Sequence, residues 1–344
     1  MDARYSRQIA LPGFGGAGQQ RLAASRVLVI GAGGLGSAVI PSLVAAGVGT
    51  VGIVDDDRVE LSNLHRQLMH GLADVGRSKV QSAMDSVAAL DPETTVIPIE
   101  QRITPANALA IFADYDLVVD GSDNFATRYL TDDAATLSGI PVVWGAVSQY
   151  GGQAGLSWAS RGPTYRDLFP VTGVALSCEI GGVLPTVVAT IASIMATEAI
   201  KVITGVGTPA VGTVTVYDAL GGGFRSISYS RNPDAPPVTQ LVDSVALTPS
   251  ELASRVDDFT LLDVREPWEA EIAALDGSVL IPLGGLEQGL DRLDPRSPIV
   301  VYCHHGVRSE TAREILEAHG FSARHLAGGI DAWARDLDPA MARY

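Results

Sequence analysis

The sequence predicts an α/β protein with two domains: a doubly wound domain with a mostly parallel sheet, and a smaller α/β domain after it. Strand-like apolar runs alternate with helix-like segments from residue 26 onward, and a second alternation follows the polar, proline-containing stretch at 234–241. Such alternation is typical of parallel strands covered by helices on both faces. The 344 residues allow two hydrophobic cores. We therefore expect domains at 1–233 and 242–344, joined by a linker at 234–241.

Composition and charge argue against several classes of protein. Hydrophobic residues make up 47% of the chain and charged residues 18%, which is typical of globular proteins, and the formal net charge of −15 disfavours a nucleic-acid partner. The start of the chain carries early charges and no apolar core typical of a secretory signal, so we expect a cytoplasmic protein. The uncharged stretch 180–197 has the length of a membrane span, but its glycines, proline and hydroxyl residues favour a buried core helix. The cysteines, Cys178 and Cys303, are expected as free thiols.

The first two elements of the chain enclose a glycine-rich turn. A strand-like run at 26–30 is followed by GAGGLGS and then by a helix-like apolar segment. Gly31, Gly33 and Gly36 occupy the first, third and sixth places of a dinucleotide-type fingerprint, with Gly34 beside them. A strand that turns into a helix in this way presents backbone N–H groups to a phosphate. The turn alone does not distinguish a dinucleotide from a nucleoside triphosphate.

The residues after the second predicted strand favour a triphosphate. The strand-like segment TVGIVDDD at 50–57 supplies Asp55, which stands where a dinucleotide-binding enzyme holds the ribose, so an NAD-dependent oxidoreductase fits up to this point. Arg66 and Lys79 then supply cations suited to a triphosphate and its leaving pyrophosphate. Taken singly, each cation also fits a solvated surface charge.

Polar residues end a further predicted strand, in the segment VVDGSDN at 118–124. Asp120, Asp123 and Asn124 come at its carboxyl end, where doubly wound sheets bind ligands. A carboxylate at this edge is suited to hold Mg²⁺ against phosphate oxygens. The alternative is a helix cap, because a helix-like segment follows directly.

In this order, the segments of the first domain resemble the ubiquitin-activating-type adenylyltransferases of sulfur-carrier pathways, the MoeB/ThiF-like family. The shared motifs are RYSRQI, GAGGLGS, DDDRVELSNLHRQ, VGRSKV and GSDN. The resemblance implies a Rossmann-like adenylation domain that uses ATP and Mg²⁺. It also implies a ubiquitin-like carrier with a C-terminal Gly-Gly as partner, in molybdopterin, thiamine, tRNA-thiolation or cysteine pathways.

The resemblance assigns roles to individual residues. It places Asp55 on the ribose and magnesium near Asp123, and it implies that Arg7 reaches the triphosphate of a partner subunit, so we expect a homodimer. Arg66, Lys79 and Asp123 are expected to act in catalysis. The nucleotide-binding residues that it implies are Arg7, Gly31, Gly33, Gly34, Gly36, Asp55, Asp57, Asn63, Arg66, Gln67, Lys79, Asp123 and Asn124.

Cys178 has two possible roles. It lies in ALSCEIGG, and a lone cysteine beside alanine and leucine is often a small buried hydrophobe. The matching loop of the resembled family holds a cysteine that links covalently to the carrier in some members. The sequence leaves a structural and a catalytic Cys178 equally open.

Cys303 is the stronger candidate nucleophile. The motif CHHGVRS takes a strand-like run into a loop that opens a helix, and such a loop directs backbone N–H groups at the sulfur. These groups stabilise a persulfide anion. The neighbouring His304 and His305 suggest metal ligation, but adjacent histidines seldom converge on one ion, so a role in shaping the loop is favoured.

The second domain resembles a rhodanese domain. LLDVREPWE, IPLGGL, CHHGVRS and LAGGIDAWA occur in the expected order. The resemblance implies that Cys303 accepts sulfur from thiosulfate or a cysteine desulfurase, and that Asp263 and Arg265 support the loop, which a plain ion pair between them would equally explain. Arg308 is expected to attract an anionic donor. The persulfide loop comprises Cys303, His304, His305, Gly306, Val307, Arg308 and Ser309.

One feature of the resembled adenylyltransferases is missing. Many of them hold structural zinc with two CxxC pairs, and this chain has Thr164 and Asp167 at the first pair and Ala235 and Pro237 at the second. We therefore expect no zinc at this place. Either packing replaces the metal or the stretch at 160–175 is mobile.

Together these residues predict an enzyme that adenylates a carrier and then transfers sulfur from Cys303 to it as a thiocarboxylate, with Cys178 available to resolve an acyl-disulfide. Two alternatives stay open. An NAD-dependent oxidoreductase would use the same glycine turn, and a non-catalytic scaffold would bind a carrier without activating it.

Overall fold

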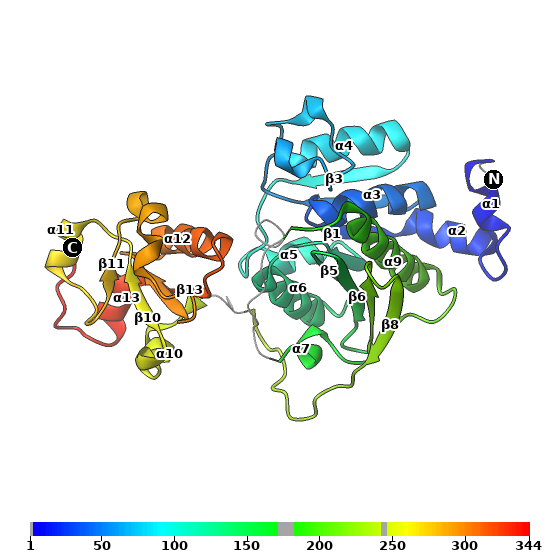
Figure 1. Cartoon of the computed structure of the whole chain (residues 1–344). Coiled ribbons are helices and arrows are strands. Elements are labelled where there is room, and N and C mark those ends of the chain that lie inside the picture. The colour runs from blue at the N-terminus through cyan, green and yellow to red at the C-terminus, as the bar shows by residue number, and fades with distance from the viewer. Residues whose placement is uncertain (1–2, 171–181, 242–245) are drawn as a thin grey trace. The chain divides into compact units, whose positions relative to one another are not determined.

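The computed structural model describes residues 3–170, 182–241 and 246–344, which fall into two compact units (Figure 1). The first unit holds the described residues up to 241 and the second holds those from 246 onward. Each unit is built on its own sheet. The fold class predicted from the sequence is confirmed: a doubly wound α/β unit precedes a smaller α/β unit.

The first unit contains an eight-stranded sheet in the order β3-β2-β1-β4-β5-β6-β7-β8. The pairs from β3 to β5 are parallel and those from β5 to β8 are antiparallel. The chain passes from β1 outward to β3 and then returns to the other side of β1 at β4, which makes the carboxyl ends of β1 and β4 a topological switch point. The strands are β1 (Arg26–Ile30), β2 (Thr50–Val54), β3 (Thr95–Ile99), β4 (Leu117–Asp120), β5 (Val142–Ser148), β6 (Gly151–Ser157), β7 (Thr213–Asp218) and β8 (Gly223–Ser228).

Helices cover both faces of this sheet because alternate strand residues point to opposite sides. Val27 and Val29 of β1 belong to one core, which includes residues of α3, α4 and α9, whereas Leu28 and Ile30 belong to the other, which includes residues of α5 and α6 (Figure 1). The helical elements are η1 (Ala3–Tyr5), α1 (Ser6–Ile9), α2 (Gly15–Ala24), α3 (Gly34–Ala46), η2 (Leu61–Asn63), η3 (Leu72–Asp74), α4 (Lys79–Leu90), α5 (Ala108–Phe112), α6 (Phe125–Ser138), α7 (Tyr165–Leu168) and α9 (Pro185–Thr204).

The long apolar helix α9 is a core element of this unit. It is the one described helix long and apolar enough to cross a membrane by length and composition. Val188, Ile191 and Met195 are fully or almost fully buried in the first core, where α9 packs beside α3, β5 and β6. The buried helix that the sequence favours is therefore present, beginning at Pro185 and ending at Thr204.

A carboxylate joins the two segments at which the resembled family carries its CxxC pairs. Asp167 accepts the N–H of Thr164 at 2.8 Å and, with its other oxygen, the N–H of Asn232 at 2.8 Å. Arg231 adds hydrogen bonds to the carbonyls of Ala159 and Gly162. Hydrogen bonds of this kind tie the segment before α7 to the segment after β8 through this chain's own residues.

The second unit is a five-stranded parallel sheet in the order β11-β10-β12-β13-β9. Two apolar cores lie on its two faces, one including Leu262 and Val301 and the other Leu261 and Val300. The strands are β9 (Ala246–Leu247), β10 (Thr260–Asp263), β11 (Val279–Leu280), β12 (Ile299–Tyr302) and β13 (Ala323–Leu326). The helical elements are α10 (Pro249–Ala253), η4 (Val256–Asp258), α11 (Pro267–Ile272), η5 (Leu283–Gly285), η6 (Glu287–Arg292), α12 (Val307–Ala318) and α13 (Gly329–Asp336).

Candidate functional site

The glycine turn lies at the switch point of the first sheet. Gly31 has a φ of +85°, which favours glycine, and its N–H donates to the carbonyl of Val54 at 2.8 Å. A Cβ on Gly36 would overlap the carbonyl oxygen of Gly31, so only glycine lets α3 start this close to the turn. Gly33 is the N-cap of α3 and offers no side chain to the first N–H groups of the helix. These N–H groups therefore face the switch point uncapped, as phosphate binding requires.

Two side chains fix the orientation of the peptide groups on either side of Ala32. Asp55 accepts the N–H of Ala32 at 2.7 Å and the N–H of Asp57 at 2.8 Å. His70 lies 2.9 Å from the carbonyl of Ala32 through Nε2, and its Nδ1 is 2.8 Å from the hydroxyl of Ser82. Burial lowers the pKa of His70 and raises that of Asp55. Sequence reasoning missed His70, because nothing in the motif HRQLMH shows that it reaches back 38 residues to the turn.

A short helical turn presents Arg66 and Gln67 over the glycines. The carbonyl of Asn63, at the end of η2, accepts the N–H groups of both residues, and Asn63 itself is buried. Carbon Cγ of Arg66 lies 4.0 Å from the position of a Cβ on Gly34, and Nε2 of Gln67 lies 3.6 Å from that on Gly33. The structure thus brings these sequence-predicted residues together.

Lys79 is a buried cation. Its side chain is 8% exposed, and its Nζ lies 2.7 Å from a carboxylate oxygen of Asp57. Burial alone would lower the pKa of Lys79, but Asp55, Asp57 and Asp123 together raise it. Lys79 is therefore not a solvated surface residue, which was the alternative that the sequence left open. It carries its positive charge beside the glycine turn.

The residues that follow β4 have different roles. The side chain of Asn124 accepts the N–H of Thr127 at 2.9 Å, so Asn124 is the N-cap of α6, and not the preceding aspartate that the sequence offered as a cap. Asp123 is exposed and acts on Lys79 through its charge. Asp120 is fully buried, and burial raises its pKa. One of its oxygens accepts the N–H of Ser122 at 2.9 Å.

Two sequence-predicted residues lie apart from this site or outside the described residues. Arg7 is exposed on α1, and the neighbouring Gln8 donates to the carbonyl of Ala46, the last residue of α3. Since the glycine turn is at the first residue of α3, a helix of 13 residues and about 20 Å separates Arg7 from it. Cys178 lies in the stretch 171–181, which is outside the described residues.

The residues at this site fit a nucleotide and a hard cation. The buried Oε1 of Gln67, beside Gly33, has no hydrogen-bond partner in the part of the chain that the structure describes. A buried acceptor in that state indicates a missing donor. The carboxylates of Asp55, Asp56 and Asp57 bring oxygens within 4.8 Å of one another, and oxygens are the ligands of Mg²⁺. Asp123, the residue predicted for magnesium, is not part of that group.

The second unit holds its thiol in a loop of backbone N–H groups. Cys303 follows β12 and is 2% exposed. Its Sγ accepts the N–H of Gly306 at 3.1 Å and lies 3.6 Å from the hydroxyl of Ser309. Gly306 has a φ of +102° and precedes α12, so the loop turns sharply into the helix. The helix α12 begins at Val307, so Arg308 and Ser309, which the sequence analysis places in the persulfide loop, lie in its first turn.

Charged residues distant in sequence support this loop. Asp263 and Arg265 form a fully buried ion pair, which is the alternative that the sequence left open beside their support of the loop, with Arg265 Nε 2.8 Å from the carboxylate. Glu269 holds Arg308 through two hydrogen bonds of 2.6 and 2.7 Å. The hydroxyl of Tyr344 donates to Glu269 at 3.0 Å and accepts from Arg265 at 2.9 Å. Glu269 and Tyr344 were not predicted, because their contacts with these residues depend on the tertiary fold.

Comparison with known proteins identifies both units. Residues 5–237 match the model of the ThiF family, and residues 248–336 match the rhodanese-like domain. The chain belongs to the ThiF family. Its second unit is a rhodanese-like domain, as the sequence predicts. These matches do not favour the oxidoreductase and scaffold alternatives.

Relatives match either nearly the whole chain or about two thirds of it. The chain is 46% identical to the probable adenylyltransferase/sulfurtransferase MoeZ of Mycobacterium tuberculosis, over 99% of this chain and 95% of the relative. It is 47% identical to the sulfur carrier protein adenylyltransferase of Thermus thermophilus, over 70% of this chain and 94% of the relative. The ThiF family member is therefore an enzyme of the adenylyltransferase and sulfurtransferase class, which confirms the predicted activity class.

A solved structure shares the fold of the first unit. Escherichia coli MccB, in a crystal structure with ATP, superimposes with a TM-score of 0.60 over 68% of this chain and 74% of that chain. The sequences are 19% identical, so the likeness shows the fold alone.

Proposed function

We propose that this ThiF family member uses ATP to adenylate the C-terminal carboxylate of a ubiquitin-like sulfur carrier ending in Gly-Gly, and then converts that end to a thiocarboxylate. The observation that carries the proposal is the presence on one chain of a ThiF family domain with an open glycine turn and a rhodanese-like domain with a loop-held thiol. The two domains supply two consecutive activities, and relatives with both are named for both.

The first activity makes the carboxylate reactive. A carboxylate oxygen is a poor leaving group, so the carrier attacks the α-phosphorus of ATP and pyrophosphate leaves. Uncapped N–H groups at Gly33 and Gly34, together with Arg66 and Lys79, are placed to stabilise the negative charge that develops on the phosphates. Asp55, by clamping the peptide at Ala32, fixes these N–H groups in advance. Bound Mg²⁺ would neutralise phosphate charge, held by carboxylates of the Asp55–Asp57 group or Asp123.

The second activity supplies sulfur. The Cys303 thiolate attacks the outer sulfur of a donor such as thiosulfate, which leaves as sulfite, and Cys303 then carries a persulfide. A cysteine desulfurase persulfide would serve equally. The N–H of Gly306, 3.1 Å from Sγ, supports the anion. The terminal sulfur attacks the acyl carbon of the adenylate and AMP leaves, which joins carrier and Cys303 through an acyl-disulfide.

Release of the thiocarboxylate needs a second thiol. We assign this step to Cys178, whose thiolate attacks Sγ of Cys303 and expels the thiocarboxylate. The resulting Cys178–Cys303 disulfide is then reduced by a cellular dithiol. An ATP-containing compartment that keeps thiols reduced suits both activities, so we place the protein in the cytoplasm.

We further propose that the working form is a homodimer. Arg7 supports this proposal, because it is exposed and lies at the end of α3 opposite the glycine turn. An arginine in that position is available to a site on a second copy. Measurement of the molecular mass in solution tests the assembly state. Pyrophosphate exchange by Arg7→Ala, measured alone and after mixing with a variant whose glycine turn is defective, tests whether Arg7 acts on the partner's site. Rescue of activity by mixing is the expected result, and no rescue contradicts it.

Cys303→Ala separates the two activities and tests the main proposal. We expect this variant to keep carrier-dependent exchange between ATP and pyrophosphate and to lose sulfur transfer from thiosulfate to cyanide. Cys178→Ala is the matched control, and it should retain both of these partial reactions while failing to release thiocarboxylate. An inactive wild-type protein in the exchange assay would instead support a scaffold. The carrier that gains an oxygen-to-sulfur mass change identifies the pathway.

A further inference from the structure

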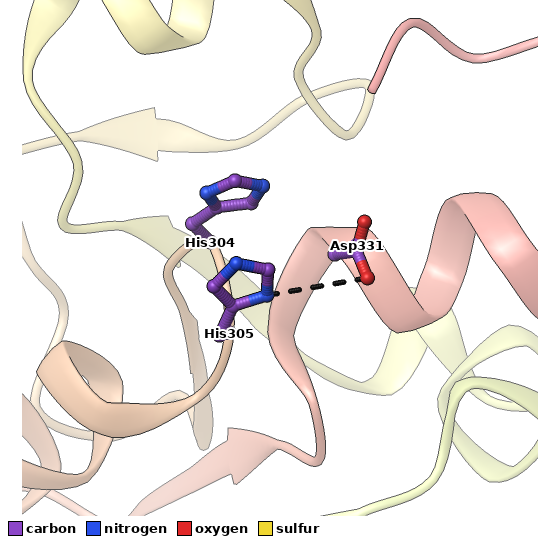
Figure 2. Close-up of side chains that lie close together, drawn as sticks. All are labelled: His304, His305 and Asp331. Carbon is purple, nitrogen blue, oxygen red and sulfur yellow. Dashed lines mark ion pairs between the residues drawn. The ribbon is translucent and has the colours of Figure 1, made fainter. Parts of the chain in front are cut away.

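We propose that His304, His305 and Asp331 form a binding site for one divalent transition-metal ion of the zinc, cobalt or nickel type. The three side chains lie at the rim of the Cys303 loop, where Figure 2 shows the His305 ring directed at Asp331 and the His304 ring beside it. One ligand atom from each residue lies within 4.8 Å of the other two. Neither the comparisons nor the proposed function assigns an ion to them.

The backbone of the loop fixes these residues relative to one another. His304 and His305 directly follow Cys303, and Asp331 lies in the first turn of α13. The N–H of Asp331 donates to the carbonyl of His304 at 3.1 Å, and the N–H of Ile330 donates to that of Cys303 at 2.9 Å. A Cβ on Gly329 would overlap both carbonyls, so the start of α13 lies directly against the loop. The distance between the ligand-bearing segments is therefore set by main-chain contacts.

The donor set is chemically suited to such an ion. Two imidazole nitrogens and one carboxylate oxygen are typical ligands of zinc and of its neighbours in the first transition series. Three protein ligands leave a coordination position open to water or a small anion.

Binding requires one small rearrangement. The His304 and His305 rings stack with centroids 3.8 Å apart and an angle of 20° between their planes, so their lone pairs lie in nearly parallel planes. Tyr344 stacks on His304 at 4.2 Å and fixes that ring. His305 is 64% exposed and its Nδ1 already lies 4.0 Å from Asp331, so its ring is the one that turns toward an ion. Ligand atoms around tetrahedral zinc lie about 3.4 Å apart, so the ligand atoms, which lie within 4.8 Å of one another, must approach by at most about 1.4 Å.

A neighbouring cation competes with the metal. Arg343 donates to the two oxygens of Asp331 at 2.8 and 3.1 Å. Because Arg343 is 52% exposed, its ion pair with Asp331 is partly screened by solvent. A doubly charged ion at the same carboxylate must displace it. Removal of Arg343 should therefore tighten metal binding, an effect that a purely structural role of Asp331 would not produce.

Titration of the full-length protein with Co²⁺ tests the site. Binding is monitored by calorimetry and by the visible absorption of the bound ion. We expect His305→Ala and Asp331→Asn each to bind one ion fewer than the wild type, or to bind it at least tenfold more weakly. Arg343→Ala should bind it severalfold more tightly. His319→Ala, which removes an exposed histidine from the end of α12, is the matched control and should bind as the wild type does.

Three results would overturn the proposal. The first is identical Co²⁺ binding by the wild type, His305→Ala and Asp331→Asn. The second is weaker binding in Arg343→Ala than in the wild type. The third is a sulfur-to-cobalt charge-transfer band that disappears in Cys303→Ala, because it would show that the thiolate, not the histidine pair, holds the ion.

Discussion

Glu269 and Arg308 form a bidentate ion pair at the Cys303 loop, with guanidinium nitrogens 2.6 and 2.7 Å from the carboxylate oxygens. The sequence suggests that Arg308 attracts an anionic sulfur donor. In the structure much of its charge is already matched by Glu269, a residue 39 positions away. The principal contribution of the pair is therefore to hold the first turn of α12, where Arg308 lies, against α11, where Glu269 lies.

Glu269→Gln should destabilise the second unit in a pH-dependent way. Arg308, opposed by burial, lowers the pKa of Glu269 to about 2 from its ordinary 4.5. A lowered carboxyl pKa stabilises the fold above the ordinary value, and this stabilisation disappears as the pH falls from about 4.5 through about 2. We expect a loss of about 2 kcal/mol at neutral pH, discounted for the partial exposure of Arg308. Hydrogen exchange of residues 246–344 measures it.

The matched control for that substitution is Glu287→Gln, which neutralises an exposed carboxylate in η6. At every pH, Glu287→Gln should show the same hydrogen-exchange protection as the wild type. Equal protection of wild type and Glu269→Gln at neutral pH would show that the ion pair does not stabilise the unit.

Gly36→Ala should abolish nucleotide binding. An added Cβ would overlap the carbonyl oxygen of Gly31, which is main chain and cannot move without opening the turn. The expected result is the loss of ATP affinity in calorimetry, with little change in the rhodanese-like unit. Gly16→Ala is the control, because a Cβ there meets nothing within 4 Å and α2 favours alanine. Normal ATP binding by Gly36→Ala would mean that the turn does not hold the phosphates.

Local pattern made part of the site predictable. The glycine spacing indicated the turn at Gly31 to Gly36, and the strand–loop–helix order indicated Cys303, because both signals lie within one short segment. Lys79 was predicted as a site residue from its motif. Its burial against Asp57 was not predicted, because the two residues are 22 positions apart in the sequence.

The other supporting contacts were beyond sequence reasoning for the same reason. His70 contacts the carbonyl of Ala32 across 38 positions, and Tyr344 contacts Arg265 across 79. No local motif distinguishes this histidine or this tyrosine from any other in the sequence. The sheet order that brings such residues together follows from long-range strand pairing, such as that of Ile30 with Asp120, which local periodicity does not specify.

Lys79→Met should eliminate adenylation. The substitution keeps an aliphatic stem of similar length and removes a positive charge that interacts with both Asp55 and Asp57. We expect pyrophosphate exchange to fall by at least a hundredfold, or about 2.7 kcal/mol, because charge developing on the leaving group loses a buried cation. The only other lysine of the chain, Lys201, pairs with Glu198 on α9, so Lys201→Met is the matched control. Retained exchange in Lys79→Met would exclude its catalytic role.

Asp132→Asn should stabilise the first unit at neutral pH, opposite to the usual effect of removing a buried carboxylate. Burial raises the pKa of Asp132 to about 6 from its ordinary 3.8, so the fold favours the neutral acid. The contribution of Asp132 to stability is greatest below about pH 3.8, falls as the pH rises toward 6, and is about 3 kcal/mol less favourable at neutral pH. Asparagine keeps an oxygen for the N–H of Tyr165 and carries no charge.

Urea unfolding of the wild type and Asp132→Asn at pH 4 and pH 7 tests this prediction. The two proteins should have similar unfolding midpoints at pH 4, and the variant should have the higher midpoint at pH 7. The adjacent Asp133→Asn breaks the ion pair with Arg166 and should lower the midpoint at pH 7, and a fall in both variants would show that Asp132 is charged and paired in the fold.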